Sequence, residues 1–314
     1  MTRRTLAWLA LNHLPGAGAV TLRRLVSRFG SPEAALEAPV HELVALGSLT
    51  LDQARAVERL ALDCAHFEEL GRRLHAAGTR LLTLEDDDYP PHLRLLRDAP
   101  PLLYVRGSLL PRDAVAVAVV GTRTPSPQGA AAAAEVGESL AARGMTVVSG
   151  LALGVDGAAH RGALAAGRSI AVLGSGIDRV TPAKHEGLAA QIARSGALLS
   201  ELPPGTRATR ETLLARNRIQ AGLTKVVIVV QCRDRGGSFA TARRALQAGR
   251  PVLAIRWEEP EFAGGVERLE KTGARVVRQV EAVAAAADAA SAPLPCPAQA
   301  EMALGDAPDV DYAW

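Results

Sequence analysis

The turn at residues 121–123 has the composition of an anion-binding site. An apolar run at 115–120, VAVAVV, predicts a buried strand, and Gly121, Thr122 and Arg123 follow it directly. The next segment, TPSPQG, leads into a predicted helix near 128–143. Backbone amides at the start of a helix and a guanidinium together bind anions. The anion is the phosphate of a nucleotide cofactor, of a small substrate, or of a nucleic acid backbone.

Similar polar turns follow the other predicted strands, at 146–149, 169–173, 197–200 and 226–230. The carboxyl ends of parallel strands meet at one edge of a sheet, where ligands bind in doubly wound folds. Many amide donors and helix N-termini would therefore face one crevice. The candidate binding residues in these turns are Ser149, Gly150, Gly174, Gly237 and Ser238.

Three titratable residues at this edge are candidates for catalysis. Asp156 and His160 lie one helical turn apart, which would suit a catalytic relay pair. We interpret them instead as a helix N-cap and a structural histidine. Glu201 is the best single carboxylate for acid–base chemistry, although the sequence suggests no partner for it.

Arginines are concentrated in the segment GTRATRETLLARNRIQAGLTK and beyond it. Arg210 precedes Arg216, Asn217 and Arg218, and further arginines follow at positions 235, 243 and 244. A guanidinium matches the oxygens of a phosphate, and one phosphate needs only one or two of them. So many arginines favour a polymeric backbone as the ligand. We expect either Arg216 or Arg218 to have a buried structural role instead.

Several cofactor and enzyme signatures are missing. No GxGxxG follows the first strand and no acidic residue ends the second, which argues against dinucleotide binding. The chain also lacks GxxxxGK[ST] and G-x-S-x-G, and its three cysteines, Cys64, Cys232 and Cys296, are too far apart for a zinc knuckle. We therefore expect no cofactor, no metal and no catalytic residues.

The elements that would position these residues alternate between strand and helix from about residue 80 onward. The strands are continuous apolar runs, which indicates burial on both faces. The predicted fold is α/β, a Rossmann-like, mostly parallel sheet with helices on both faces. Residues 1–75 form a small all-helical domain with a helix-hairpin-helix-like turn at LPGAGAV, 76–280 the Rossmann-like domain, and 281–314 an Ala/Pro/acidic tail with one short helix.

Charge is distributed unevenly along the chain. The net charge is +3, yet residues after Arg278 carry −6 and no basic residue, so 1–278 carry +9. A basic body indicates a polyanionic partner, or else an arginine-rich solvated surface. No apolar run approaches the roughly 20 residues that span a membrane, so we expect a cytoplasmic protein without a membrane partner.

Six ordered motifs resemble the DNA-processing protein A family (DprA, also called Smf). They are VAVVGTRTPSPQG, VVSGLALGVDGAAHRGAL, IAVLGSGIDRVTPAKH, GALLSELPPGT, ARNRIQAGL and GGSFATARRAL. The resemblance covers about residues 1–278. It implies a helical domain of the sterile-alpha-motif or helix-hairpin-helix kind. It also implies a homodimer that binds single-stranded DNA without hydrolysing anything, and that loads the RecA recombinase in natural transformation and recombination.

The resemblance also implies roles for single residues. Arg123 matches the family's DNA-phosphate contact, Lys184 falls where the family has a basic residue, and Arg210 lies in the basic loop before ARNR. The usual Trp-His-Phe-Pro run before ARNR is replaced by 211–214, ETLL, which offers no aromatic ring for a base. The tail cannot form the winged-helix domain that many relatives carry.

An enzyme remains the alternative. Nucleoside-monophosphate phosphoribohydrolases share Rossmann-like folds and need a glutamate after a Gly-Gly-x-Gly-Thr loop. The corresponding stretch here has Arg243 and Arg244 instead. A third possibility is a nucleotide-sensing module without a role in DNA binding.

Overall fold

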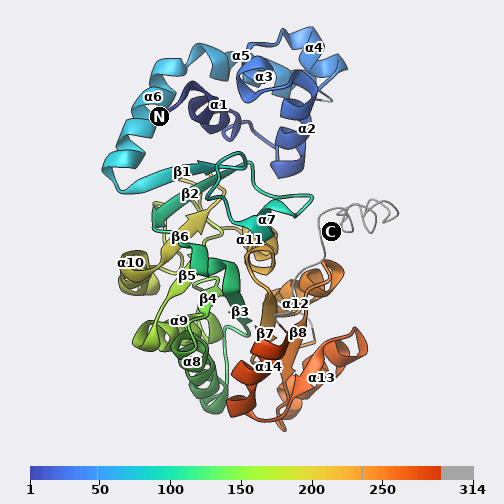
Figure 1. Cartoon of the computed structure of the whole chain (residues 1–314). Helices are drawn as coiled ribbons and strands as arrows, with labels where there is room; N and C mark the ends of the chain where they lie inside the picture. Colours follow the sequence, from blue (N-terminus) through green and yellow to red (C-terminus); the bar gives the residue numbers. More distant parts are fainter. Residues whose placement is uncertain (48, 235, 291–314) are drawn as a thin grey trace.

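The computed structural model describes residues 1–47, 49–234 and 236–290 of the chain (Figure 1). Six helices form the predicted helical domain. They are α1 (Arg3–Leu11), α2 (Ala19–Phe29), α3 (Pro32–Glu37), α4 (Val40–Ala45), α5 (Leu51–Leu62) and α6 (Cys64–Ala76). Side chains cap three of them, α1, α3 and α5: the Ser31 hydroxyl accepts from the Ala34 N–H at 3.1 Å, and Thr50 with Gln53 forms a capping box. Only α4 was not expected.

A single nine-stranded sheet forms the rest of the fold, in the order β1-β2-β6-β5-β4-β3-β7-β8-β9. From β6 to β9 all neighbouring strands are parallel, as predicted. β1 (Thr79–Thr83) and β2 (Leu102–Gly107) form an antiparallel pair that extends the sheet beyond β6. The parallel strands are β3 (Ala116–Val120), β4 (Thr146–Ser149), β5 (Ser169–Val172), β6 (Ala197–Ser200), β7 (Val226–Val229), β8 (Val252–Ile255) and β9 (Arg275–Val277).

Helices cover both faces of this sheet, which confirms the α/β prediction. One face is packed by α8 (Pro127–Ala142), α9 (Val155–Ala166), α10 (Glu186–Ser195) and α14 (Val283–Ala290). The other is packed by α7 (Pro91–Arg94), α11 (Arg210–Leu223), α12 (Gly237–Gln247) and α13 (Pro260–Lys271). α7 and α13 were not expected. α14 is the short helix predicted in the tail, whose residues 291–314, including Cys296, lie outside the described residues.

The helical domain shares a hydrophobic core with the sheet. Leu9 and Leu11 of α1 belong to the same buried cluster as Tyr104 of β2 and Ile192 of α10. The Tyr104 hydroxyl also donates to the Asn12 side chain at 2.8 Å. In the part of the chain that the structure describes, no helix is both long and apolar enough to cross a membrane.

Candidate nucleic-acid interface

A cavity of about 820 Å³ opens at the carboxyl edge of the sheet, beside the ends of β3 and β7. This is the point where the strand order reverses. From β3 the chain continues to its neighbour β4 on one side of the sheet, whereas β7, on the other side of β3, is followed by β8 in the opposite direction. Doubly wound folds bind ligands at such a switch point. The start of α11 and the start of α12 complete the lining. Eight predicted site residues line the cavity: Gly121, Thr122, Arg123, Arg210, Arg216, Asn217, Gly237 and Ser238.

The turn that carries Arg123 is braced on two sides. The Thr122 N–H donates to the Gln231 carbonyl at 2.8 Å, and the Thr122 carbonyl accepts from the Val155 N–H at 3.2 Å. Gly121 is required because a Cβ there would lie 2.5 Å from Val155 Cγ2. The backbone of the turn is therefore fixed, while the Arg123 side chain is exposed at the cavity.

Arg216 is the buried cation of the cavity. Its side chain lines the cavity, yet the residue is only 4% exposed, and its Nε and Nη1 have no hydrogen-bond partner among the described residues. Burial lowers the pKa of Arg216 to about 10, the Asp156 charge opposes this shift, and the Arg123 charge adds to it. Arg216 thus remains protonated at neutral pH. A buried cation with unsatisfied donors costs free energy unless an anion reaches it.

Asp156 and His160 are structural. The Asp156 carboxylate accepts from the Gly150 N–H at 3.1 Å and the Ala152 N–H at 3.4 Å, and burial raises its pKa. His160 Nδ1 pairs with Ser169 Oγ at 2.7 Å, and burial lowers its pKa to about 3. His160 is fully buried, which agrees with the interpretation of it as a structural histidine. Asp156 lies in the first turn of α9, but the N-cap is Gly154, so that detail was wrong.

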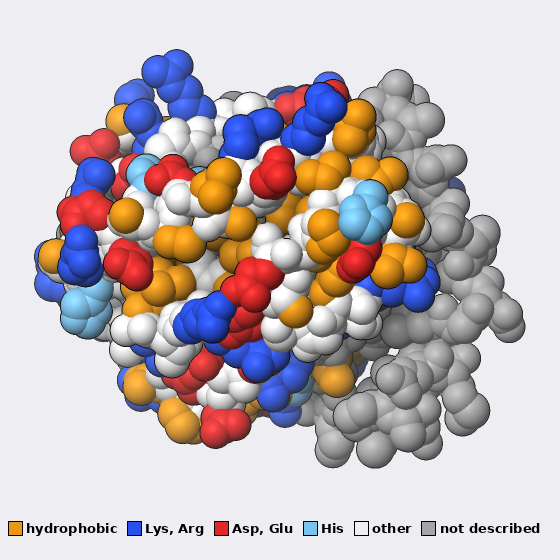
Figure 2. All heavy atoms as spheres, turned by 90° about the horizontal axis from the view of Figure 1, so that it is seen from above, with side chains coloured by type: hydrophobic (Ala, Val, Ile, Leu, Met, Phe, Trp, Pro, Cys, Tyr) orange, Lys and Arg blue, Asp and Glu red, His pale blue; other side chains and the backbone are white. Residues whose placement is uncertain are grey.

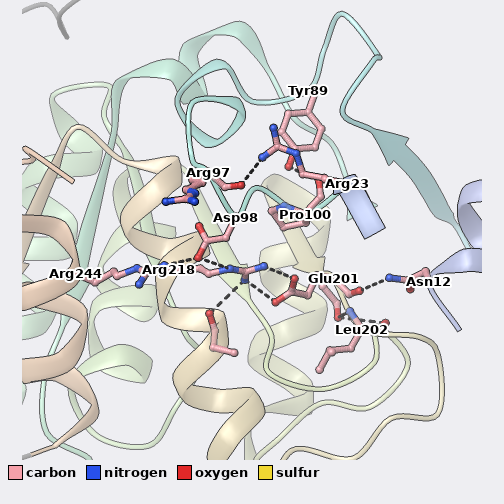
Figure 3. Close-up of polar contacts among 12 residues, drawn as sticks. Asn12, Arg23, Tyr89, Arg97, Asp98, Pro100, Glu201, Leu202, Arg218 and Arg244 are labelled. Atoms are coloured by element: carbon pink, nitrogen blue, oxygen red, sulfur yellow. Dashed lines mark hydrogen bonds and ion pairs between the residues drawn. The ribbon is translucent and has the colours of Figure 1, made fainter. Parts of the chain in front are cut away.

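Arg218 is not part of the cavity lining. It belongs to an ion network beside the helical domain (Figure 3). Its Nη1 and Nη2 each donate to one Glu201 oxygen at 2.6 Å, and its Nε lies 3.3 Å from Asp98 Oδ2. Arg244 also pairs with Asp98. The expected phosphate contact by Arg218 must therefore be corrected. Two carboxylates, Glu201 and Asp98, already pair with its guanidinium. Glu201 likewise has a partner, contrary to the sequence-based expectation.

Four other predicted residues also lie outside the cavity lining. The Ser149 hydroxyl donates to the Val119 carbonyl at 2.6 Å, which ties β4 to β3. Gly150 makes room for Arg216, because a Cβ on Gly150 would lie 1.5 Å from Arg216 Nη1. Gly174 is packed against Leu213 and its carbonyl accepts from the Thr212 hydroxyl at 2.7 Å. Lys184 is exposed on a short 3-10 helix, Ala183–His185.

Sequence reasoning missed Gln231, which positions the turn before α8. Its Oε1 accepts from the Ser126 N–H at 3.0 Å, and its Nε2 donates to the Ser126 hydroxyl at 2.9 Å. The signal was present: a glutamine directly follows the apolar run VVIVV. Arg233 lines the cavity too, but its guanidinium already pairs with Glu261. Arg235 lies outside the described residues.

Three comparisons with known proteins find similar proteins of the same kind. The family model described as DNA recombination-mediator protein A matches residues 80–288. Protein Smf of Synechocystis is 34% identical over 281 residues, which are 86% of this chain and 69% of that protein. The structure of DNA processing protein A from Streptococcus pneumoniae superposes with a TM-score of 0.76 at 30% identity, over 90% of this chain and 98% of that one.

A second solved structure is described with its ligand. It is DNA processing protein A from Helicobacter pylori, described by its single-stranded DNA binding mode. Its TM-score is 0.60 at 31% identity, over 66% of this chain and 95% of that one.

Proposed function

Because this chain belongs to the DNA recombination-mediator protein A family, we propose that its cavity binds the backbone of single-stranded DNA. Arg123 and Arg210 hold phosphates at the cavity mouth, and Arg216 holds one deeper inside. The protein passes the strand to the RecA recombinase as a homodimer, in natural transformation and recombination, and does not react with it. The match to the family of DNA recombination-mediator protein A and the single-stranded DNA binding of the Helicobacter pylori protein support this proposal.

The observation that carries the proposal is the state of Arg216. Two of its nitrogens are buried without a partner, next to a second cation that faces the same cavity. Two cations that are close together repel each other, and a phosphate between them removes that repulsion while it accepts their hydrogen bonds. The amides at the start of α12 add further donors, since its N-cap Gly236 has no side chain to occupy them.

A strand fits this cavity better than a small phosphorylated substrate does. Arg123 and Arg210 are exposed at the cavity, while Arg216 is buried. A row of cations from the surface inward suits successive phosphates of a polymer. Backbone contacts carry no sequence information, so binding is independent of sequence.

The cavity is poorly equipped for hydrolysis. Among its described lining residues, Asp156 is the only carboxylate, and two backbone N–H groups already occupy it. The glutamate of phosphoribohydrolases is replaced by Arg243 and Arg244, and Arg244 pairs with Asp98. Incubating the protein with nucleoside monophosphates tests the enzyme alternative, because a hydrolase would release the free base.

The direct test is Arg123→Ala, with binding to oligothymidine measured across a range of salt concentrations. We expect affinity to fall by roughly 3- to 30-fold and the salt dependence to become shallower, because one phosphate contact is lost. Arg194→Ala is the matched control: Arg194 is also exposed, but it lies near the end of α10, at the amino edge of the sheet. If Arg123→Ala binds like the wild type at every salt concentration, the site is wrongly placed.

A further inference from the structure

We propose that a cleft between the helical domain and the Rossmann-like domain holds the bases of the strand whose phosphates occupy the cavity. This inference rests on the proposed function. The cleft has a volume of about 950 Å³, at the upper end of the range typical of ligand pockets. One wall is the α1–α2 turn at residues 12–18 with the start of α2, and the other is formed by residues 201–206 and parts of α11 and α12.

The cleft adjoins the phosphate cavity. Leu214 and Asn217 of α11 and Ala240 of α12 line both spaces. Asn217 closes part of the wall between the two helices, because its Nδ2 donates to the Gly237 carbonyl at 3.2 Å. A strand that leaves the cavity past these three residues would enter the cleft.

The chemistry of the cleft differs from that of the cavity. Its acidic and basic residues largely balance: Arg218, Arg243 and Arg244 face Asp98, Glu201 and Glu211. Arg218 and Arg244 are already paired with carboxylates, as Figure 3 shows. Such a floor has little excess charge to attract a phosphate.

The walls of the cleft are mostly apolar. Pro15 and Val20 contribute from the hairpin side, and Leu202, Pro203 and Leu214 from the other side. Flat bases with apolar faces and polar edges match apolar walls above a polar floor. The segment 211–214 lacks the aromatic ring on which a base could stack, so the strand needs another apolar surface for its bases.

Exposed apolar area alone would not select this cleft. Hydrophobic side chains lie at many places among charged and polar ones on the face seen in Figure 2, which looks down on the helical domain. Val44, Leu46, Leu51 and Leu62 are all at least 39% exposed, yet none of them lines the cleft. Val20 differs from these positions because it lines a cleft that adjoins the cavity.

The test compares tryptophans placed at two exposed valines. Val20 is 42% exposed and lines the cleft, whereas Val44 is 39% exposed and does not. Oligothymidines of about 4 and about 16 nucleotides are titrated into Val20→Trp, Val44→Trp and the wild type, with fluorescence emission and affinity recorded. For Val20→Trp we expect roughly 5-fold or more tighter binding of the longer strand, and quenching of the added emission by stacked bases. For Val44→Trp we expect neither.

A second substitution guards against a tryptophan that creates its own site. Val20→Asp should weaken binding of the longer oligothymidine several-fold and leave the shorter one unchanged, since a new carboxylate repels the strand. Wild-type affinities for both strand lengths in Val20→Asp, with no quenching in Val20→Trp, would overturn the base cleft. A cleft that binds peptide instead gives this same negative result.

The two proposals fail in different ways. If Arg123→Ala weakens binding but the Val20 variants have no effect, the cavity holds the strand and the cleft does not. If the wild type binds neither oligothymidine, the proposed function itself is wrong.

Discussion

The buried position of the Arg216 side chain requires a glycine at position 150. A Cβ at position 150 would overlap the guanidinium of Arg216, although the backbone of Gly150 is not in the left-handed region that requires glycine. Gly150→Ala should therefore displace Arg216 and lower the affinity for oligothymidine by roughly 10-fold or more, the effect of losing a hydrogen-bonding site to a charged group. Isothermal titration or fluorescence anisotropy measures this loss.

Gly187→Ala is the matched control for that substitution. A Cβ on Gly187, in α10, meets no atom within 4 Å. We expect this variant to keep its affinity and to gain up to about 1 kcal/mol in the free energy of unfolding, because alanine favours a helix over glycine. Unchanged affinity in Gly150→Ala would show that Arg216 does not contact the strand.

The positions of some site residues could be predicted from the sequence, whereas the surroundings of others could not. The position of Arg123 at the carboxyl edge of the sheet could be expected, because it follows a buried strand in a recognisable turn. The roles of Arg216 and Arg218 could not be separated, although one of the two was expected to be structural. Residues two apart on a helix point in directions about 200° apart, so these two arginines must face different surroundings. Only the positions of Glu201 and Asp98 decide which arginine is neutralised.

α11 carries both the proposed binding function and the junction between the domains. One side of the helix presents Arg216 to the cavity, and another holds Arg218 against Glu201 and Asp98. Close to this network, the Asn12 side chain donates to the Glu201 carbonyl at 3.1 Å, and Arg23 donates to the Leu96 and Arg97 carbonyls (Figure 3). These hydrogen bonds connect the helical domain to residues 96–97 and 201, and both Glu201 and Asp98, which follows Arg97, pair with Arg218 of α11.

Glu201→Gln tests this junction. The substitution leaves Arg218, which is only 11% exposed, without its bidentate partner. We expect the free energy of unfolding to fall by about 1–3 kcal/mol, because a largely buried charge loses its compensation. Chemical denaturation measures the change. Glu69→Gln is the control, since the Glu69–Arg72 pair is exposed and should contribute less than about 1 kcal/mol. Equal losses in both variants would mean that the network does not stabilise the junction.

Elements were predictable where burial imposes a simple pattern. The parallel strands are mostly apolar, and from β3 to β8 every strand residue is buried. All of the parallel strands were located within one residue at either end. α13 was missed because Gly264 and Gly265 interrupt its helical pattern. Packing explains one of these glycines: a Cβ at Gly265 would lie 2.2 Å from the Cys232 carbonyl oxygen. The position of β1 and β2 beside β6 is a long-range pairing that no local pattern contains.

At the scale of the whole molecule, the uneven distribution of charge along the chain affects the binding of any polyanion. Residues 291–314 contain Glu301, Asp306, Asp309 and Asp311 and no lysine or arginine, so they carry −4. The net charge of +3 for the chain therefore becomes +7 for residues 1–290. A negative segment tethered to a basic body lowers the local attraction for a strand, and salt screens this effect over about 10 Å at 0.1 M.

Removing residues 291–314 should therefore strengthen binding of oligothymidine at low salt, by roughly 3- to 10-fold, and accelerate association. The difference should vanish at high salt, where long-range attraction is screened. A full-length variant with the four carboxylates changed to amides is the control, because it removes the charge and keeps the length. If the truncation strengthens binding but the amide variant does not, the segment acts by occupying space. If neither variant differs from the wild type at low salt, the long-range field of the molecule plays no part in capturing the strand.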